Sequence, residues 1–245
     1  MSTIVKSKAF VLNKLDFGDT SKIVNFYSNE FGRVAGIIKG ARSSKSKIGK
    51  IVDVLNLVEI IFYKKDGRDI QVVTQADLVS NYTNIKSDLD KLKCASSIIE
   101  LVLRLTLEDD PHKRLFSGME KILQRMDSEQ TEPMLLFIMF YKFFLEEIGY
   151  GIVADSCSEC NKNLSSSAEV LYNYELGFMC KSCGTDHLIN YKFSSELFGK
   201  IICLSQRNKN CSYEKIELEN IISFFEKFLI YHIDEYNGLK SLQMY

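Results

Sequence analysis

Cys157-Ser-Glu-Cys160 and Cys180-Lys-Ser-Cys183-Gly184 are the two short segments that decide how this chain is organised. Each segment places two thiols on one tight turn, and nineteen residues separate the two pairs. Zn²⁺ prefers a tetrahedral shell of such thiolates, and this separation falls within the zinc-ribbon range. The spacing therefore predicts a structural zinc site at Cys157, Cys160, Cys180 and Cys183, with two disulfides or unligated thiols as alternatives. Gly184 fits the end of the second turn, where a positive φ is expected.

The other cysteines and the N-terminus bear on the compartment. The chain has seven cysteines, yet it begins Met-Ser-Thr-Ile-Val-Lys and lacks the basic and then apolar pattern of a signal peptide. We therefore expect a cytoplasmic protein, in which thiols stay reduced and paired cysteines bind metal. Cys94 and Cys203 lie in apolar helical patterns and are expected to be small core residues, and Cys211 also lies outside the pairs.

Upstream of the cysteines, residues 1–80 have the pattern of a small β-barrel. Runs rich in Val, Ile, Phe and Tyr alternate with turn signals, of which Lys65-Asp-Gly67 predicts a type I′ hairpin turn. Five short strands in this length favour a closed oligonucleotide-binding (OB)-like barrel, although an SH3-like barrel would show nearly the same pattern. The expected strands are residues 7–14, 21–28, 33–39, 52–63 and 70–77.

A cationic segment lies between the third and fourth expected strands: Lys39-Gly-Ala-Arg-Ser-Ser-Lys-Ser-Lys-Ile-Gly-Lys50. Residues 1–50 carry ten cations and three anions, a balance of +7 in a chain whose net charge is −1, so the remainder is −8. Exposed Lys and Arg beside Gly and Ser suit phosphate contacts, and the alternative is a solvated loop that is basic by chance. With a barrel beneath the segment, we favour phosphate binding.

Aromatic residues in the same region offer a second kind of nucleic-acid contact. They are Phe17, Phe26, Tyr27 and Phe31. Their rings could stack on unpaired bases, but aromatic residues in strands usually face inward. We therefore expect all four in the core.

From residue 84 the apolar period changes from two to about 3.6 residues, which predicts helices. The first two carry apolar stripes, at Leu92, Ala95, Ile99, Leu103 and Leu107 and then at Leu115, Met119, Ile122 and Met126. A third has Pro133 in its first turn and is apolar almost all round. It is shorter than the roughly 20 residues that span a bilayer, so we expect a buried helix. Two more helices, near residues 195–206 and 217–232, close the chain.

Together these patterns predict an α+β protein. An N-terminal five-stranded OB-like β-barrel is followed by an α-helical domain with an inserted four-cysteine zinc ribbon. The expected domains are the barrel at residues 1–80, the helical domain at 84–149 and 192–245, and the zinc-binding module at 150–191, with a hairpin between its cysteine pairs.

The sequence gives no indication of catalysis. A zinc hydrolase needs an open coordination position, whereas four thiolates close the shell. His112, His187 and His232 share no motif, and a role for His187 as a ligand or in support of one is the less favoured alternative. No Walker-type phosphate loop is present. We expect a protein that is not an enzyme.

The order of these parts resembles the bacterial recombination mediator family RecO, and the resemblance covers the whole chain. The matching segments are Gly32-Arg33, Lys39-Gly-Ala-Arg42, Lys45-Ser-Lys47, Glu147-Ile-Gly-Tyr150 and Leu239-Lys-Ser-Leu242. The resemblance implies a DNA repair protein that binds single- and double-stranded DNA. It also implies annealing of complementary strands coated with single-stranded DNA-binding protein, and action with RecR to help load RecA.

The resemblance further implies which residues contact DNA. The family's basic barrel surface corresponds to Arg33, Lys39, Arg42, Lys45 and Lys47, and Lys14, Lys22 and Lys50 are added on charge alone. The helical domain is implied to contact the acidic, apolar-ended tail of single-stranded DNA-binding protein, which the motifs do not locate. The helical patches Lys86/Lys91/Lys93 and Arg207/Lys209 are expected to be solvated faces.

Two other classes of function remain open at this point. One is a zinc-ribbon adaptor between proteins of a transcription or translation assembly, and the other is a zinc enzyme with an unrecognised nucleophile. The cysteine module itself has no Lys or Arg from Ser165 to Phe178. We therefore expect a metal clip that stabilises an inserted hairpin and could offer a protein-docking surface, rather than a DNA-binding finger.

Overall fold

The computed structural model describes residues 2–165, 167, 169–206 and 211–243 of the 245-residue chain. The chain divides into two compact units. The first comprises Met1–Phe140 and Leu239–Tyr245, and the second comprises Tyr141–Gly238. The fold is α+β, with a five-stranded barrel in the first unit and the four paired cysteines in the second. None of the described helices is both long enough and apolar enough to cross a membrane.

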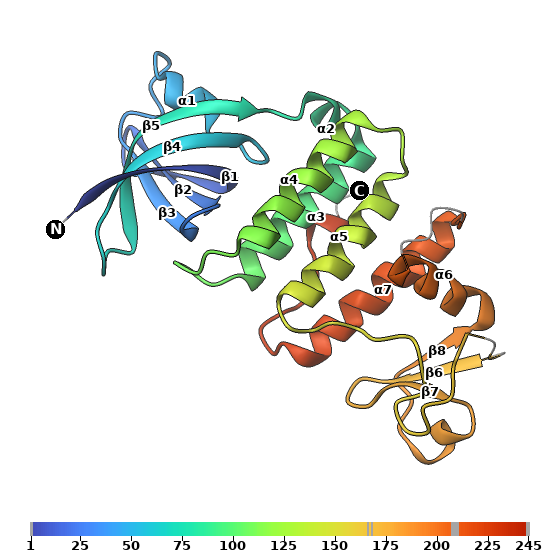
Figure 1. Ribbon diagram of the computed structural model, residues 1–245. Coiled ribbons are helices and arrows are strands. Elements are labelled where there is room, and N and C mark those ends of the chain that lie inside the picture. The colour runs from blue at the N-terminus through green and yellow to red at the C-terminus, as the bar shows by residue number, and fades with distance from the viewer. Residues whose placement is uncertain (1, 166, 168, 207–210, 244–245) are drawn as a thin grey trace. The chain divides into compact units, whose positions relative to one another are not determined.

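Five strands form a closed barrel in the order β1-β2-β3-β5-β4 (Figure 1). They are β1 (Thr3–Phe17), β2 (Ser21–Ser28), β3 (Gly32–Ile38), β4 (Leu57–Lys64) and β5 (Ile70–Ser80). The first half of β1 pairs with β4 and its second half pairs with β2. β3 and β5 pair in parallel through residues 35–37 and 70–72, whereas the other pairs are antiparallel. The double pairing of β1 closes the barrel and confirms the expected OB-like architecture.

Three details of the barrel differ from the sequence expectation. β1 is longer at both ends, because each end pairs with a different strand. β4 begins at Leu57 rather than at residue 52, because Leu55 has a φ of 75° and interrupts the extended backbone. In the turn after β4, Gly67 has a φ of 71° but Asp66 has no positive φ. The turn is therefore not of type I′, which needs a positive φ at both central residues.

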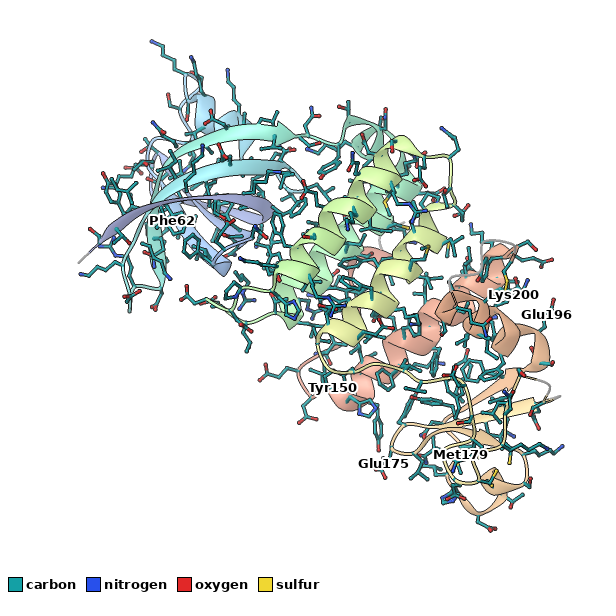
Figure 2. The ribbon with its side chains drawn as sticks, in the orientation of Figure 1. Phe62, Tyr150, Glu175, Met179, Glu196 and Lys200 are labelled. Carbon is teal, nitrogen blue, oxygen red and sulfur yellow. A yellow bond between two sulfur atoms is a disulfide. The ribbon has the colours of Figure 1, made fainter. Side chains whose placement is uncertain are left out.

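The barrel interior is filled by apolar side chains from all five strands. Phe26 and Phe62 are fully buried, and Phe62 is labelled in Figure 2. Phe31 packs edge-on against Phe62 with ring centroids 5.5 Å apart. Tyr27 is buried beside Phe116 of the following helices. The expectation for Phe17 was wrong, since its side chain is 51% exposed. Phe17 pairs with Ser21 at the end of the β1–β2 hairpin, where the barrel interior no longer reaches it.

Four helices follow the barrel: α2 (Thr83–Ser87), α3 (Leu89–Leu105), α4 (Lys113–Ser128) and α5 (Pro133–Glu147). The Asp88 side chain caps α3 by accepting a hydrogen bond from the Lys91 N–H at 3.0 Å. The predicted stripe of α4 is buried as expected. α3 ends at Leu105, so Leu107 lies beyond the helix and is 71% exposed, contrary to expectation. Seven of the fifteen residues of α5 are buried, all between Leu136 and Leu145, so its predicted burial is confirmed for that stretch. The helix passes from the first unit into the second at Tyr141.

The end of the chain returns to the first unit, where Glu100 of α3 holds it. The Glu100 carboxylate accepts hydrogen bonds from the backbone N–H groups of Lys240 at 3.0 Å and Ser241 at 2.8 Å. Arg104 lies 3.0 Å from the same carboxylate. Burial acts to raise the pKa of Glu100, but these partners outweigh it and the pKa is lowered. The short helix η2 (Ser241–Gln243) is thereby fixed on α3.

The second unit contains a three-stranded antiparallel sheet in the order β7-β6-β8. β6 (Glu169–Asn173) and β7 (Gly177–Cys180) form the predicted hairpin. Met179 of β7 is labelled in Figure 2. β8 (Tyr191–Ser194) was not predicted and follows the short helix η1 (Cys183–Asp186). Helices α6 (Ser195–Ser205) and α7 (Lys215–His232) complete the unit. Phe193 and Phe224 join the sheet to α7 with ring centroids 4.9 Å apart.

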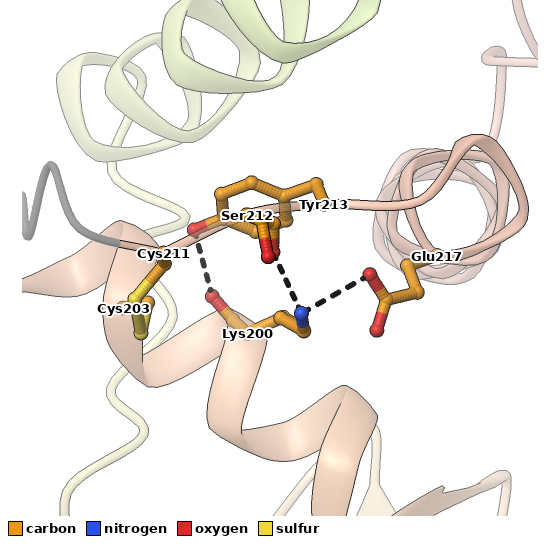
Figure 3. The surroundings of a disulfide bond; sticks show 6 residues. All are labelled: Lys200, Cys203, Cys211, Ser212, Tyr213 and Glu217. Atoms are coloured by element: carbon orange, nitrogen blue, oxygen red, sulfur yellow. Dashed lines mark hydrogen bonds and ion pairs between the residues drawn. A yellow bond between two sulfur atoms is a disulfide. The ribbon is translucent and has the colours of Figure 1, made fainter.

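Cys203 of α6 and Cys211 form a disulfide, which corrects the expectation that Cys203 is a small core residue (Figure 3). The expectation of reduced thiols does not hold for this pair. Lys200 of α6 further holds the segment after Cys211 and the start of α7. Its Nζ donates to the Ser212 carbonyl at 2.6 Å and lies 3.3 Å from Glu217 of α7. The apolar pattern of α6 could not reveal the bond, since the pairing depends on where Cys211 lies in space and not on the pattern within the helix.

Candidate metal centre and nucleic-acid interface

The four paired cysteines meet in the second unit. Their sulfur atoms all lie within 4.8 Å of one another. Cys157 and Cys160 precede β6, Cys180 ends β7 and Cys183 begins η1. Cys157 and Cys180 are buried, Cys183 is half-buried and Cys160 is exposed. Four sulfur donors in this space could hold one metal ion.

Backbone hydrogen bonds fix the first cysteine pair against the hairpin. The Cys157 N–H donates to the Lys162 carbonyl at 2.8 Å, and the Asn161 N–H donates to the Cys157 carbonyl at 3.0 Å. Asn161 has a φ of 58°, a left-handed conformation that asparagine tolerates, and it turns the chain after Cys160. The Ser158 N–H then donates to the Phe178 carbonyl of β7 at 2.8 Å. These bonds bring the first pair beside the end of β7, where the second pair begins.

Gly184 serves packing rather than a left-handed turn. It is not among the described residues with a positive φ, so that expectation was wrong. A Cβ at this position would collide with the Leu171 side chain and would lie 3.3 Å from Ile189. Glycine is needed here because η1 packs closely against β6.

Hydrogen bonds around the sulfurs separate the pKa values of the thiols. The Ser182 hydroxyl, 3.3 Å from Cys180 Sγ, lowers the pKa of that thiol to about 6. Burial acts to raise the pKa of Cys157, but backbone N–H groups of Cys160 and Cys180 outweigh it and the pKa is lowered. The sulfurs of Cys180 and Cys160 raise the pKa of Cys183 to about 12. The thiols of Cys180 and Cys157 therefore ionise more readily than that of Cys183, and the thiolate is the form that binds a metal.

His187 lies outside this group of four sulfurs. Its Nε2 is 2.7 Å from the Glu159 carboxylate, in the turn that carries Cys157 and Cys160. Within the described part of the chain, the cluster that could hold a metal contains cysteines alone. Four sulfurs are a complete tetrahedral donor set, so this arrangement does not call for His187 as a ligand.

The basic segment, residues 39–50, is tied to the barrel at several points. Ala41 is buried in the barrel core, and the Arg42 N–H donates to the Thr20 carbonyl of the β1–β2 turn at 2.9 Å. The Ser46 side chain caps the short helix α1 (Lys47–Ile51) by accepting from the Gly49 N–H at 3.1 Å. A Cβ at Gly49 would collide with the Ala41 carbonyl, so glycine permits the close approach of α1. The segment thus has a defined conformation with a short helix, which its Gly/Ser-rich sequence did not predict.

Four lysines of the basic segment face solvent: Lys39, Lys45, Lys47 and Lys50. No residue that the structure describes forms an ion pair with any of these four side chains. Their ammonium groups are therefore available to an external anion. Of the cations predicted from the sequence, these four are the best placed to meet a phosphate chain.

Three other predicted cations have carboxylate partners. Arg42 Nε and Lys22 Nζ lie 3.3 Å and 3.7 Å from Asp16, and Lys14 Nζ lies 2.7 Å from Asp53. Arg42 also donates to the Gly18 carbonyl at 2.7 Å and so helps hold the β1–β2 turn. Partly exposed ion pairs of this kind are worth little and can be exchanged for contact with a phosphate.

Arg33 is placed differently from the other predicted cations. Its side chain is 23% exposed and donates through one guanidinium nitrogen to the Leu103 carbonyl of α3. The other terminal nitrogen lies 3.4 Å from Glu108, and the Asp109 N–H donates to the Arg33 carbonyl at 3.2 Å. These contacts connect β3 to the segment after α3, a structural role that the Gly32-Arg33 motif did not reveal.

Sequence reasoning missed a hollow beside the β4–β5 turn. Ser2, Tyr63, Lys65, Arg68 and Val72 line it. The alternation of the strand indicated that Tyr63 lies on the outer face of the barrel. Phe62 and Tyr63 are adjacent, and only one of them can face the barrel interior.

The helical patches are less exposed than expected. Lys86 donates to the Asn56 side chain and lies 3.9 Å from Asp53, and burial lowers the pKa of this lysine. Lys91 donates to the Glu129 carbonyl at 3.3 Å, and Lys93 is half-buried. Arg207 and Lys209 lie outside the described residues.

Comparison with known proteins covers both units. The family described as "Recombination protein O N terminal" matches residues 1–82, and "Recombination protein O C terminal" matches residues 86–241. A protein named "DNA repair protein RecO" from Chloroherpeton thalassium is 26% identical over 99% of this chain and 98% of its own length. Its namesake from Chlorobium limicola is 30% identical over 74% of this chain and 69% of its own length. The chain therefore belongs to the recombination protein O (RecO) family.

Proposed function

We propose that this chain is a non-enzymatic DNA repair and recombination protein that binds single- and double-stranded DNA through its barrel. Membership of the RecO family and the names of its relatives support a role in DNA repair and recombination. The observation that carries the DNA-binding surface is the set of exposed lysines on a segment fixed to an OB-like barrel, Lys39, Lys45, Lys47 and Lys50. OB-type barrels commonly bind oligonucleotides. Arg42, Lys14 and Lys22 join this surface when phosphate replaces their carboxylate partners. Arg33 instead holds β3 in place through its contacts with Leu103 and Glu108.

Strand annealing follows from the same surface without covalent chemistry. Lysines that neutralise phosphates release counterions and reduce the repulsion between two strands, and base pairing then supplies the specificity. In this proposal the protein anneals strands coated with single-stranded DNA-binding protein and acts with RecR to help load RecA. The helical domain binds the tail of single-stranded DNA-binding protein. The protein acts in the bacterial cytoplasm, at the nucleoid during repair.

We assign a separate role to each predicted domain. Residues 1–80 bind DNA, residues 84–149 and 192–245 form the helical partner-binding domain, and residues 150–191 form the metal module. The metal is structural Zn²⁺, one per chain, at Cys157, Cys160, Cys180 and Cys183. Support for zinc comes from the donor set, because four thiolates suit Zn²⁺ and leave no open position for a reacting water.

A salt titration of DNA binding tests the proposed surface. We expect Lys39→Gln, Lys45→Gln and Lys47→Gln, combined in one variant, to weaken binding of labelled single-stranded and duplex DNA. On single strands, the slope of log affinity against log salt should become shallower by roughly 0.7 for each phosphate that is no longer neutralised. Fluorescence anisotropy at several salt concentrations measures both quantities, with and without single-stranded DNA-binding protein.

The matched control combines Lys113→Gln, Lys121→Gln and Lys215→Gln, which removes three exposed lysines elsewhere on the chain. Its affinity and salt slope should stay close to those of the unsubstituted protein. An unchanged slope in the triple variant would show that the basic segment is not the DNA site. Absence of measurable DNA affinity in the unsubstituted protein would instead favour a protein adaptor.

A further inference from the structure

Two cysteines outside the four-sulfur cluster are joined in the second unit. Cys203 lies in the last turn of α6, and Cys211 precedes α7, which begins at Lys215. The Cα atoms of the two cysteines are 6.4 Å apart, within the range that a disulfide spans without movement of the backbone. The other five cysteines of the chain are free thiols.

Contacts that involve no sulfur hold the same two segments together (Figure 3). Lys200 Nζ donates to the Ser212 carbonyl at 2.6 Å and lies 3.3 Å from the Glu217 carboxylate. The Tyr213 hydroxyl donates to the Lys200 carbonyl at 3.4 Å. Lys200 Nζ also lies 5.6 Å from the centre of the Tyr213 ring. The end of α6 is thus connected to the start of α7 by a hydrogen-bonded group as well as by the disulfide.

The position of these contacts keeps the two thiols near each other. Lys200 and Cys203 are three positions apart in α6, and residues at this spacing share one face of a helix. Cys211 is the neighbour in sequence of Ser212, which Lys200 binds. Reduction of the disulfide therefore leaves both thiols in place to form it again, as if each were present at a high concentration around the other.

These two cysteines are also the ones that a small thiol or disulfide can reach. Cys203 and Cys211 are both half-buried, so their sulfurs are accessible to exchange. Cys94 is buried in α3, and this burial raises the pKa of its thiol to about 12. Such a thiol stays protonated at neutral pH, whereas the thiolate is the reactive form. The four clustered cysteines are metal ligands in the proposed function, which leaves Cys203 and Cys211 open to exchange.

The proposed cytoplasmic location bears on what this bond does. Cytoplasmic thiols keep most cysteines reduced, and the disulfides that form there are usually transient or sense the redox state. We propose that Cys203 and Cys211 are a reversible dithiol–disulfide couple, oxidised by a low-molecular-weight disulfide and reduced by the corresponding thiol. The oxidised form fastens the end of α6 to the segment that leads into α7. This inference goes beyond the proposed DNA binding, and its tests need no DNA.

The oxidation proceeds in two exchange steps. The thiolate of one cysteine attacks a sulfur of the small disulfide, breaks its sulfur–sulfur bond and releases one small thiolate, which leaves a mixed disulfide on the protein. The thiolate of the second cysteine attacks the protein sulfur of that mixed disulfide, forms the Cys203–Cys211 bond and releases the second small thiolate. Two electrons pass from the protein thiols to the small disulfide, and the two protons lost by the cysteines end on the released thiols.

The bond has a structural effect because α6 packs against the sheet that carries the metal module. Phe198 of α6 contacts Phe178 of β7 with ring centroids 5.1 Å apart, and its ring lies 6.4 Å from that of Phe193 in β8. A cross-link between Cys203 and Cys211 also reduces the freedom of the unfolded chain. The oxidised protein should therefore melt roughly 3–8 °C above the reduced protein.

A titration in glutathione buffers tests the couple. The full-length, zinc-loaded protein is equilibrated at a series of ratios of oxidised to reduced glutathione, alkylated, digested with trypsin and analysed by mass spectrometry. Trypsin cuts after Lys and Arg, so the two cysteines fall on separate peptides, residues 201–207 and 210–215. The disulfide-linked pair of peptides should form in oxidised glutathione and disappear in reduced glutathione.

Three results of this titration overturn the inference. One is free thiols at Cys203 and Cys211 at every ratio, and another is a bond that reduced glutathione does not break in the folded protein. The third is accumulation of mixed disulfides with glutathione in place of the bond.

Thermal unfolding tests the effect of the bond on the second unit. The unsubstituted protein should melt at a higher temperature in oxidised than in reduced glutathione. Cys203→Ser with Cys211→Ser is the control and should melt at the same temperature in both buffers. Equal melting temperatures of the fully linked and fully reduced unsubstituted protein overturn the fastening of α6.

Lys200→Gln tests whether the hydrogen-bonded group holds the thiols together. At constant reduced glutathione, half-oxidation of this variant should need roughly 3-fold more oxidised glutathione, or more than that. Lys192→Gln, at an exposed position of β8, removes the same charge in the same unit and should leave the midpoint unchanged. An unchanged midpoint in Lys200→Gln overturns the role of these contacts in the couple. Failure of the proposed function would appear separately, as no DNA binding by the unsubstituted protein.

Discussion

Gly49 links the fold of the barrel to its proposed DNA surface at the scale of a single residue. It brings α1 against the Ala41 carbonyl, and Ala41 is itself part of the barrel core. The lysines on either side keep their positions through this contact, although Gly49 itself has no side chain and no charge.

Gly49→Ala should therefore weaken DNA binding although it removes no cationic side chain. The new Cβ forces α1 away from the barrel, which we expect to cost about 1–3 kcal/mol of unfolding free energy. Urea unfolding and anisotropy titrations measure the two effects. Gly199→Ala in α6 is the control, because its Cβ meets open space, and it should stabilise the protein by about 0.5–1 kcal/mol. A Gly49→Ala protein with normal stability and affinity would rule out this role.

Single residues also show where sequence reasoning stops. Charge and motif were enough to select Lys39 and Lys45, whose side chains face solvent. The same criteria selected Arg33, which is turned towards Leu103 and Glu108. Those partners lie some seventy positions along the chain, so the contact depends on tertiary packing that no local pattern records.

At the scale of elements, long periodic segments were predictable, whereas the short strand β8 was not. α4 and α5 are 16 and 15 residues long, and the apolar stripe of the first and the largely apolar sequence of the second indicate burial without tertiary information. β8 has four residues and is recognisable only from its pairing with β6. The paired cysteines were predictable because each metal-binding turn is local in sequence. The Cys203–Cys211 disulfide was not, because it depends on the distance in space between α6 and the residue Cys211.

The metal module should stabilise the second unit by holding its two cysteine turns together. Removal of zinc with a chelator, or Cys157→Ser with Cys183→Ser, should lower the melting temperature by at least several degrees, because the cysteine turns lose their common anchor. Intrinsic DNA affinity should stay nearly constant. Metal analysis, thermal unfolding and DNA titration give the three readouts, with Glu159→Gln beside the cluster as a control. A parallel loss of DNA affinity would indicate that the module contacts DNA directly.

At the scale of the whole molecule, the chain leaves the first unit at α5 and returns to it at Leu239. Glu100 secures the return through two backbone N–H groups. Its pKa in the folded protein lies below the ordinary value of 4.5. The stabilisation from this carboxylate is therefore fully present above that ordinary value and is lost as the pH falls through the lowered one.

Glu100→Gln should accordingly destabilise the protein near neutral pH by about 2 kcal/mol, the range for hydrogen bonds to a charged group. The difference from the unsubstituted protein should shrink on acidification below about pH 4.5. Unfolding free energies over a pH series measure it, with the exposed Glu219→Gln as control. A difference that stays constant with pH would show that the ionised carboxylate is not what holds the C-terminal segment.

The closure of the barrel also determines how copies of this protein can crowd together. An open sheet exposes a row of unpaired amides and carbonyls, and neighbouring molecules can add to it as extra strands. In the β1-β2-β3-β5-β4 barrel every strand has a partner on both sides. Copies brought close together, as on the nucleic acid of the proposed function, therefore find no open edge on the barrel of a neighbour.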